Sequence, residues 1–311
     1  MVKKIKIYKN FEKNKKDKKS IILIGNFDGL HSGHQKLFKQ AKKLKNKLNL
    51  KLGVITFDPI PKMFFNKNIK NFKLMNMNQK IEQFKKQNVD FLINQKFSKK
   101  FSKIKANSFI DNYLDKKIKA KFLFVSNNFK FGNKREGDIN LLKFYEKKYN
   151  YKLIIPSPLK KNKKIISSTL IRKFLSNGNL NIANKLLSRN WEIEGKIQKG
   201  RKVGRKIGYA TCNIDIQDYL IAKPGVYSVK VKLGQKTKKI KGIANLGYRP
   251  TFNQKKILLE VNLFKFNKDI YNRRIRVEFI KFIRSEKRFK NIKKLTNQIK
   301  KDIKVARKSL N

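Results

Sequence analysis

Short apolar segments alternate with helical patterns through the first half of the chain, and this alternation constrains the fold more than any other feature. Five segments read as strands: residues 20–24, 52–57, 91–94, 121–125 and 153–156. Between them, helical patterns occur at residues 33–48, 79–86 and 108–115. Strands that alternate with helices favour the α/β class, with a doubly wound parallel sheet that binds ligands at the carboxyl ends of its strands.

The second half changes character after a helical pattern at residues 182–189. Five alternating segments, at 192–198, 226–233, 239–245, 258–266 and 274–282, are separated by glycine and asparagine turns. This pattern predicts a small antiparallel β-barrel. Apolar residues at helical spacing between 291 and 310 predict a C-terminal helix packed on that barrel. A length of 311 residues suits two domains, which we expect at residues 1–184 and 185–311.

The net charge is +60, from 80 Lys and Arg against 20 Asp and Glu. Such a charge attracts nucleic acids and anionic membranes without sequence preference. The basic residues form short clusters along the whole chain rather than one tail, so we interpret the charge as compositional and expect no specific nucleic-acid partner. The alternative that the charge keeps open is a basic nucleic-acid-binding protein on a decayed enzyme scaffold.

The residues that the chain lacks indicate its compartment. Cys212 is the only cysteine, so no intrachain disulfide can form. The first ten residues have no apolar core of the length that a signal peptide needs. The longest apolar runs fall far short of the roughly 20 residues that span a bilayer. We therefore expect a soluble, cytoplasmic protein with no membrane partner.

The segment GNFDGLHSGH, residues 25–34, lies between the first predicted strand and the first predicted helix and contains both histidines of the chain. Glycines allow close approach to a phosphate, and a helix start supplies unpaired N–H groups. His31 and His34, three residues apart, can face one anion. A metal site lacks a third ligand, and purely structural histidines are the other alternative, so we favour phosphate binding. The expected nucleotide-binding residues of this segment are Gly25, Asn26, Phe27, Asp28, Gly29 and Gly33, of which Asn26 and Asp28 could instead only shape the turn.

This segment resembles the G-x-F-D-G-x-H-x-G-H signature of the nucleotidyltransferase superfamily at every fixed position. A second signature of the superfamily is matched by SSTLIR at residues 167–172, where we expect Ser168 to cap the following helix. Together with NFKFG at residues 128–132, the first domain is similar to the FMN adenylyltransferase module of bacterial bifunctional riboflavin kinase/FAD synthetases.

The resemblance implies in-line attack by the FMN phosphate on the α-phosphorus of ATP, with magnesium present and pyrophosphate as the leaving group. It implies that His31 and His34 bind the α- and β-phosphates. It also implies that Arg172 holds the leaving pyrophosphate. The further nucleotide contacts that it implies are Ser168, Thr169 and Asn128.

The second domain carries its own set of motifs. Residues 200–213, GRKVGRKIGYATCN, resemble the riboflavin kinase signature, in which a loop rich in glycine and arginine precedes P-T-A-N. PGVY at 224–227, GIANLGYRPTF at 242–252 and LEVNL at 259–263 follow in the order of the family. The resemblance implies that Thr211 and Asn213 hold Mg²⁺ and that Glu260 takes the proton of the riboflavin 5′-hydroxyl. It implies a loop that covers the ATP phosphates, through Gly200, Gly204, Arg205 and Gly208.

Three positions depart from the family pattern: Ala210 replaces proline, Asn272 replaces glycine, and Ser126 replaces glycine. Ala210 frees a backbone angle beside the metal motif, whereas asparagine tolerates the left-handed conformation of a turn. We expect the chain to convert riboflavin to FMN in the second domain and FMN to FAD in the first, with riboflavin, FMN, FAD and ATP as ligands. The oligomeric state stays open. A superfamily enzyme with another phosphate acceptor would leave the kinase motifs unexplained.

Overall fold

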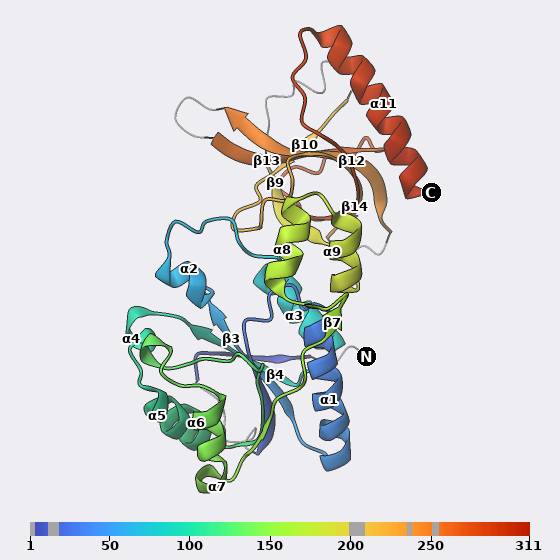
Figure 1. The fold of residues 1–311 in the computed structure, drawn as a ribbon. Coiled ribbons are helices and arrows are strands. Elements are labelled where there is room, and N and C mark those ends of the chain that lie inside the picture. Colours follow the sequence, from blue (N-terminus) through green and yellow to red (C-terminus); the bar gives the residue numbers. More distant parts are fainter. Residues whose placement is uncertain (1–3, 12–18, 199–208, 235–237, 251–254) are drawn as a thin grey trace. The chain divides into compact units, whose positions relative to one another are not determined.

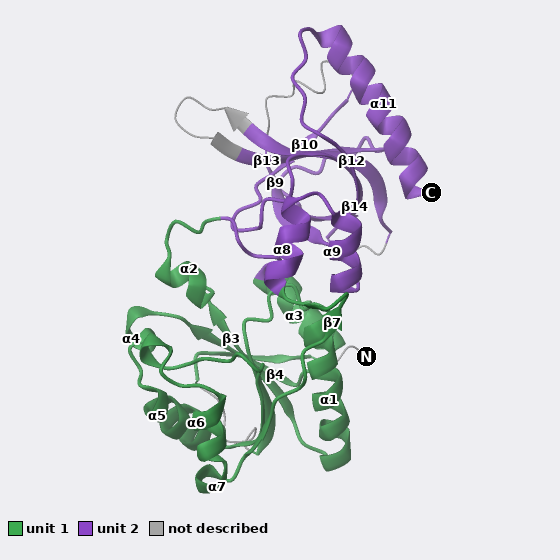
Figure 2. Ribbon diagram, viewed as in Figure 1, with its two compact units in different colours: residues 1–70, 77–167 green, residues 71–76, 168–311 purple. Residues whose placement is uncertain are grey.

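A computed structural model describes residues 4–11, 19–198, 209–234, 238–250 and 255–311. The chain divides into two compact units, one of residues 1–70 with 77–167 and one of residues 71–76 with 168–311 (Figures 1 and 2). The second unit thus includes a short segment that precedes it by almost 100 residues in the sequence. The domain boundary expected between residues 184 and 185 stays a prediction.

The first unit is built on a six-stranded parallel sheet, as the sequence predicts. Its strands, in spatial order, are β1 (Lys6–Lys9), β4 (Phe91–Lys96), β3 (Leu52–Asp58), β2 (Ser20–Ile24), β5 (Ala120–Phe124) and β6 (Lys152–Ile154). All five residues of β2 are buried, which explains why its uninterrupted apolar run was recognisable. The edge strand β1 was not predicted, because its sequence KIYK, two apolar residues between two lysines, resembles much of this lysine-rich chain.

Helices cover both faces of this sheet (Figure 1). Helix α1 (Ser32–Leu48) packs with α3 (Met77–Lys86), where the rings of Phe38 and Phe84 stack with centroids 5.8 Å apart. The helix predicted at residues 108–115 begins as α5 (Ala106–Phe109) and continues as a π-helix, η2 (Ile110–Ile118), whose wider turn the apolar pattern did not indicate. The remaining elements are α2 (Pro61–Phe65), α4 (Lys99–Ser102), η3 (Asn133–Arg135), α6 (Ile139–Phe144), α7 (Glu146–Tyr149), and the hairpin β7 (Lys160–Lys161) and β8 (Lys164–Ile165).

The order of the strands reverses at β2. From β2 the chain first adds β3 and β4 on one side and then returns to add β5 and β6 on the other. In open parallel sheets, ligands bind at such a reversal, outside the carboxyl ends of the two strands. The loops that follow β2 and β5 are therefore the expected position of a site, and they carry the Gly25–His34 and Asn128–Gly132 motifs.

The second unit contains the predicted barrel. Six antiparallel strands close in the order β10 (Cys212–Ile214), β13 (Lys255–Leu263), β12 (Ile240–Pro250), β11 (Gly225–Leu233), β14 (Arg274–Ser285) and β9 (Glu192–Gln198). The three-residue β10 was not predicted as a strand. Helix α11 (Ile292–Leu310) covers the barrel, where Ala306 packs against Val226 and Ile243. The predicted C-terminal helix is confirmed.

Two further helices, α8 (Ser168–Ser176) and α9 (Leu180–Leu187), belong to the barrel unit. Asn184 of α9 donates to the Phe279 carbonyl on β14 at 3.1 Å and accepts from the Trp191 N–H at 2.8 Å. Trp191 is buried against Phe279. These contacts attach the helices to the start of the barrel sequence.

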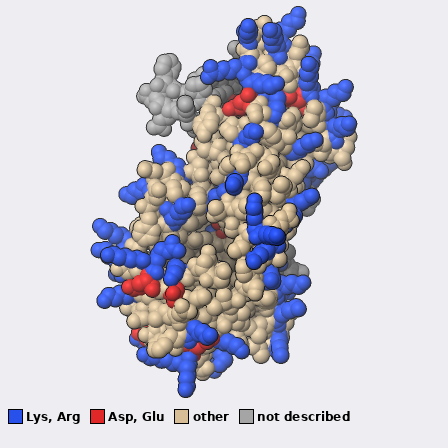
Figure 3. All heavy atoms as spheres, in the orientation of Figure 1, with Lys and Arg blue, Asp and Glu red and all other residues tan. Residues whose placement is uncertain are grey.

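Lysines and arginines occur on the visible faces of both units and gather in no single stripe (Figure 3). Within the described part of the chain, no helix is both long and apolar enough to cross a membrane.

Candidate active sites

The Gly25–His34 loop leaves the sheet at β2 with three residues in the left-handed region. The φ angles of Phe27, Gly29 and Leu30 are +46°, +83° and +39°. Such angles are unfavourable for side chains other than glycine and persist where packing enforces them. Phe27 is buried, and its ring lies 5.2 Å from that of Phe38 on α1, centroid to centroid. Packing therefore holds this loop in one conformation at the start of α1.

His31 is the N-cap of α1. Its Nδ1 accepts a hydrogen bond of 3.3 Å from the His34 backbone N–H, so helix α1 begins at Ser32, one residue before the predicted start. A nitrogen that accepts carries no proton, and the proton of the neutral ring is then on Nε2. The rings of His31 and His34 stack with centroids 3.7 Å apart and 21° between their planes. The structure thus brings the two histidines together at the start of α1.

His34 is held in its neutral form. Its pKa lies well below the ordinary value, first because the ring is buried and then because a charge on it would lie beside His31 and the Lys80 ammonium. Lys80, on α3, is only 4% exposed. Among the described residues, the buried His34 Nδ1 has no hydrogen-bond partner. At neutral pH this ring can bind a phosphate through a hydrogen bond but brings no charge of its own.

Gly33 lies close to His31, which leaves little room for a side chain. A Cβ at this position would lie 3.1 Å from His31 Nδ1 and 3.3 Å from the Ile166 carbonyl oxygen, closer than ordinary van der Waals contact. Asn26, two positions after β2, accepts at its backbone oxygen from Thr56 Oγ1 at 3.3 Å. Its side-chain Oδ1 is buried and has no partner among the described residues. Asn26 and His34 therefore each present an unsatisfied polar atom in this loop.

Asn128 lies in the loop after β5, the strand that neighbours β2. Ser126 Oγ donates to Asn128 Oδ1 at 2.9 Å, so the serine that replaces the family's glycine holds this side chain. In the same loop, the rings of Phe129 and Phe131 stack with centroids 5.6 Å apart. Because β5 pairs directly with β2, the Asn128 loop and the histidine loop leave the same edge of the sheet.

The second superfamily motif lies on α8, in the barrel unit. Ser168, which the sequence predicts as the N-cap, is instead the first helical residue of α8, so the cap position falls on Ser167. The difference is one residue, which is the usual uncertainty of a helix boundary. Arg172, one turn further, donates from Nε to the Phe72 carbonyl at 3.0 Å, and its guanidinium carbon lies 3.6 Å from the centre of the Phe72 ring. The structure does not place Arg172 and the histidines within one compact unit.

The kinase motif residues meet across two barrel strands. Asn213 on β10 lies directly opposite Glu260 on β13 in the antiparallel register. Directly opposed residues share one face of a sheet, so the two side chains are neighbours. Asn213 is 5% exposed, and its buried Oδ1 has no hydrogen-bond partner among the described residues. Thr211 immediately precedes β10 and is exposed.

The departures from the kinase pattern are accommodated. The Ala210 carbonyl accepts a 2.7 Å hydrogen bond from Asn262 Nδ2, which attaches the segment before Thr211 to β13. Asn272 has a φ of +62°, so the asparagine adopts the left-handed conformation expected of it. Burial raises the pKa of the Cys212 thiol to about 12, so this cysteine is unreactive. Four predicted residues lie outside the described residues: Gly200, Gly204, Arg205 and Gly208.

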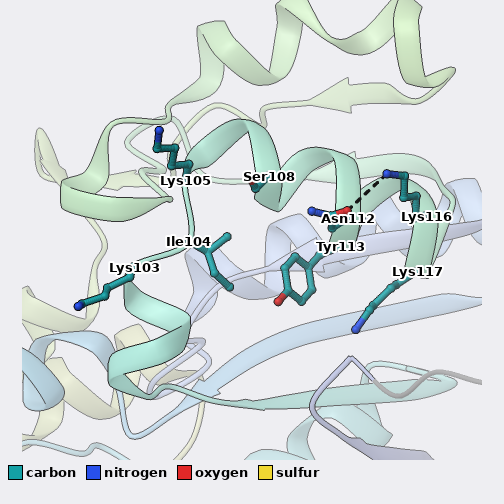
Figure 4. Close-up of a pocket in the computed structure, with 8 residues that line it drawn as sticks. All are labelled: Lys103, Ile104, Lys105, Ser108, Asn112, Tyr113, Lys116 and Lys117. Carbon is teal, nitrogen blue, oxygen red and sulfur yellow. Dashed lines mark hydrogen bonds between the residues drawn. The ribbon is translucent and has the colours of Figure 1, made fainter.

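A separate hollow of about 560 Å³ lies against α5 and η2 (Figure 4). Two of its lysines make contacts of their own: Lys116 forms a 2.8 Å ion pair with Asp111, and Lys117 Nζ lies 5.2 Å from the Tyr113 ring centre. The lining contains no predicted site residue and consists of Lys103, Ile104, Lys105, Ser108, Asn112, Tyr113, Lys116 and Lys117.

The sequence did not indicate two residues that contact the predicted site residues, Lys80 and Phe72. One lysine on an amphipathic helix gives no signal in a chain with 80 basic residues. Phe72 is separated from Arg172 by 100 positions, and no local pattern links residues so far apart.

Comparison with known proteins agrees with both sets of motifs. Residues 13–170 match the family model described as FAD synthetase, and residues 187–310 match the one described as riboflavin kinase. A bifunctional riboflavin kinase/FMN adenylyltransferase of Buchnera aphidicola (Schizaphis graminum) is 41% identical, over 94% of each chain. The protein of the same description from Escherichia coli K12 is 34% identical, over 92% of this chain and 91% of its own.

A solved structure also shares the fold. A crystal structure described as a macrolide-efflux protein from Streptococcus pneumoniae aligns with a TM-score of 0.85 and 30% identity. The alignment covers 97% of this chain and 99% of that one.

Proposed function

The chain belongs to the bifunctional riboflavin kinase/FMN adenylyltransferase family, and from this premise we propose how its residues divide the two reactions. The chain phosphorylates riboflavin to FMN and adenylylates FMN to FAD, with ATP as the donor in both steps. We assign the first step to Glu260, Asn213 and Thr211 in the barrel, and the second to the His31–His34 pair with Arg172.

In adenylyl transfer, an FMN phosphate oxygen attacks the α-phosphorus of ATP. The bond from that phosphorus to the bridging oxygen breaks, and pyrophosphate leaves. Such a reaction needs positioning and charge stabilisation rather than a covalent enzyme intermediate. His31 Nε2–H and the neutral His34 ring donate to phosphate oxygens, at the start of α1 where further N–H groups add positive potential. The capped, stacked histidine pair is the observation that carries this assignment.

The leaving pyrophosphate is assigned to the first turns of α8. Ser168 and Thr169 supply hydroxyl donors, and Arg172 supplies a permanent charge with a planar set of N–H groups that matches phosphate oxygens. Asn128 and Asn26, at the carboxyl edge of the sheet, are proposed to contact the nucleotide. In this division, the histidines bind the phosphate that reacts, and Arg172 binds the leaving pyrophosphate, on which negative charge accumulates.

In the kinase reaction, the riboflavin 5′-hydroxyl attacks the γ-phosphorus of ATP, and ADP leaves. Glu260 accepts the hydroxyl proton as the bond to phosphorus forms. The pairing of Asn213 with Glu260 across β10 and β13 carries this assignment, because it places a general base beside a metal-ligand candidate.

A magnesium ion fits the residues of this site. Oxygen ligands are those that Mg²⁺ prefers, and the buried Asn213 Oδ1, unpaired among the described residues, is such an oxygen. Thr211, two residues earlier, supplies a hydroxyl. When bound, the ion would neutralise charge on the ATP phosphates. The residues Thr211 and Asn213 would hold it, while Glu260 moves the proton.

The kinase assignment is tested by Glu260→Gln, which keeps the shape of the side chain and removes its basicity. General bases contribute about 10²–10⁴-fold, so riboflavin phosphorylation should fall by roughly this factor while FMN adenylylation stays unchanged. A matched control is Glu278→Gln on β14, because that carboxylate is already paired with Lys239 at 2.7 Å. Full kinase activity in Glu260→Gln would remove this residue from the mechanism.

A further inference from the structure

Residues 71–76, called the strap here, connect α2 to α3 in sequence but belong to the barrel unit. The backbone N–H groups of Phe72 and Lys73 donate to the Asp218 carbonyl at 2.9 and 2.8 Å. The Leu220 N–H donates in return to the Lys73 carbonyl at 2.8 Å. The strap is thus bonded, residue by residue, to the segment that follows β10.

Side chains strengthen this attachment at both ends. Asn71 Nδ2 donates to the carbonyls of Gln217 and Tyr219 at 2.6 and 3.1 Å. Trp191 Nε1 donates to the Leu74 carbonyl at 3.0 Å. Because the strap is hydrogen-bonded on both sides of Phe72, this residue is held in a fixed position.

Phe72 makes two different contacts with Arg172. Its carbonyl accepts from Nε at 3.0 Å, and its ring lies under the guanidinium, 3.6 Å from the guanidinium carbon. The hydrogen bond fixes the Nε edge and the ring fixes the plane, so together they set the orientation of the whole group. Because Nε is already bound to the Phe72 carbonyl, a pyrophosphate would be bound through the Nη groups.

We propose that Phe72 is a positioning residue for adenylyl transfer, which presents the Nη groups of Arg172 to the pyrophosphate. This inference rests on the role given to Arg172 under the proposed function. An arginine side chain has many rotamers, and ordering it on binding costs free energy. A guanidinium already held by a ring and a carbonyl avoids part of that cost.

Pyrophosphate binding in the reverse reaction, in which FAD and pyrophosphate give FMN and ATP, measures this effect directly. Phe72→Leu keeps the carbonyl and most of the apolar volume but removes the ring. From the usual strength of such contacts, the KM for pyrophosphate should rise roughly 2- to 30-fold. The KM for FAD and the rate of riboflavin phosphorylation should not change. Phe72→Tyr, which keeps the ring, should restore the KM.

A matched control is Phe264→Leu, which removes a ring 5.3 Å from the guanidinium of Arg307 elsewhere in the same unit; it should leave pyrophosphate binding unchanged. The variant Arg172→Gln distinguishes a failure of the role proposed for Arg172 from a failure of the role proposed for Phe72. If Arg172→Gln raises the KM for pyrophosphate and Phe72→Leu does not, Phe72 has no positioning role. If Arg172→Gln has no effect, the proposed role of Arg172 fails, and the inference fails with it. An equal loss in both half-reactions of Phe72→Leu would indicate general destabilisation and would also overturn the inference.

Discussion

Replacing Gly33 by alanine tests whether the position of His31 controls adenylyl transfer. The new Cβ would lie 3.1 and 3.2 Å from His31 Nδ1 and Cε1, and the Ile166 carbonyl at 3.3 Å prevents it from moving away. Contacts of this length force a neighbour to shift by a few tenths of an ångström. The imidazole is the part that can yield, so its cap bond to the His34 N–H should weaken.

The size of the effect follows from that displacement. A misplacement of about 1 Å can cost roughly 10²-fold in rate, so a few tenths should cost roughly 3- to 10-fold in FMN adenylylation. Stability should change little, because alanine favours a helix over glycine by up to about 1 kcal/mol. A weakened cap costs a similar amount, and the two effects offset each other.

The assay compares FMN adenylylation and riboflavin phosphorylation in Gly33→Ala, with urea unfolding as a measure of stability. Ser32→Ala is the matched control, since it changes the same helical turn without adding an atom beside His31. An adenylylation rate equal to that of the unchanged chain in Gly33→Ala would refute the reasoning, as would an equal loss in the control.

Three further predictions concern the surroundings of His34 and the barrel unit. The pKa of His34 is depressed in the folded chain and near 6.5 in the unfolded chain; as the pH falls below about 6.5, the unfolded chain binds more protons. The free energy of unfolding should therefore decrease by up to about 1.4 kcal/mol for each pH unit below this value. The variant His34→Gln, which leaves the neighbouring titratable residues His31 and Asp28 in place, should reduce this slope when it is measured by urea unfolding at several pH values. Lys80→Met should raise the pKa of His34, which NMR can follow because the chain has only two histidines; an unchanged pKa would exclude the electrostatic effect of Lys80. A fragment of residues 190–311 should be less stable than one of residues 168–311, since it loses Leu180, Leu186 and Leu187 of α9, each worth about 1.5–3 kcal/mol when buried; equal thermal midpoints would contradict this.

Much of the fold could be predicted because its elements have strong local patterns. Residues 21–24 form an uninterrupted apolar run, and β2 is buried along its whole length. The barrel strands alternate, and α11 repeats its apolar residues at helical spacing. By contrast, β10 has only three residues, and β1 has an exposed edge position with two lysines. Short elements of this kind form because longer neighbours offer them hydrogen bonds, which is a property of the fold rather than of their own sequence.

The same distinction applies to the sites. The spacing of His31 and His34 within ten residues, and the order of the kinase motifs, were visible in the sequence. The stacking of the two rings, the capping role of His31 and the neutral state of His34 depend on the buried contacts of Phe27 and Lys80. The contact between Phe72 and Arg172 joins distant segments and could not be predicted from either of them.

The central claim is that one chain performs two reactions with separate residues. The most direct test incubates the unchanged protein and His34→Ala with riboflavin, ATP and magnesium, and separates the flavins by chromatography over time. The unchanged chain should form FMN and then FAD. His34→Ala should accumulate FMN at a near-normal rate with little FAD. If His34→Ala forms FAD at the rate of the unchanged chain, or loses FMN formation equally, the division of the two reactions proposed here is wrong.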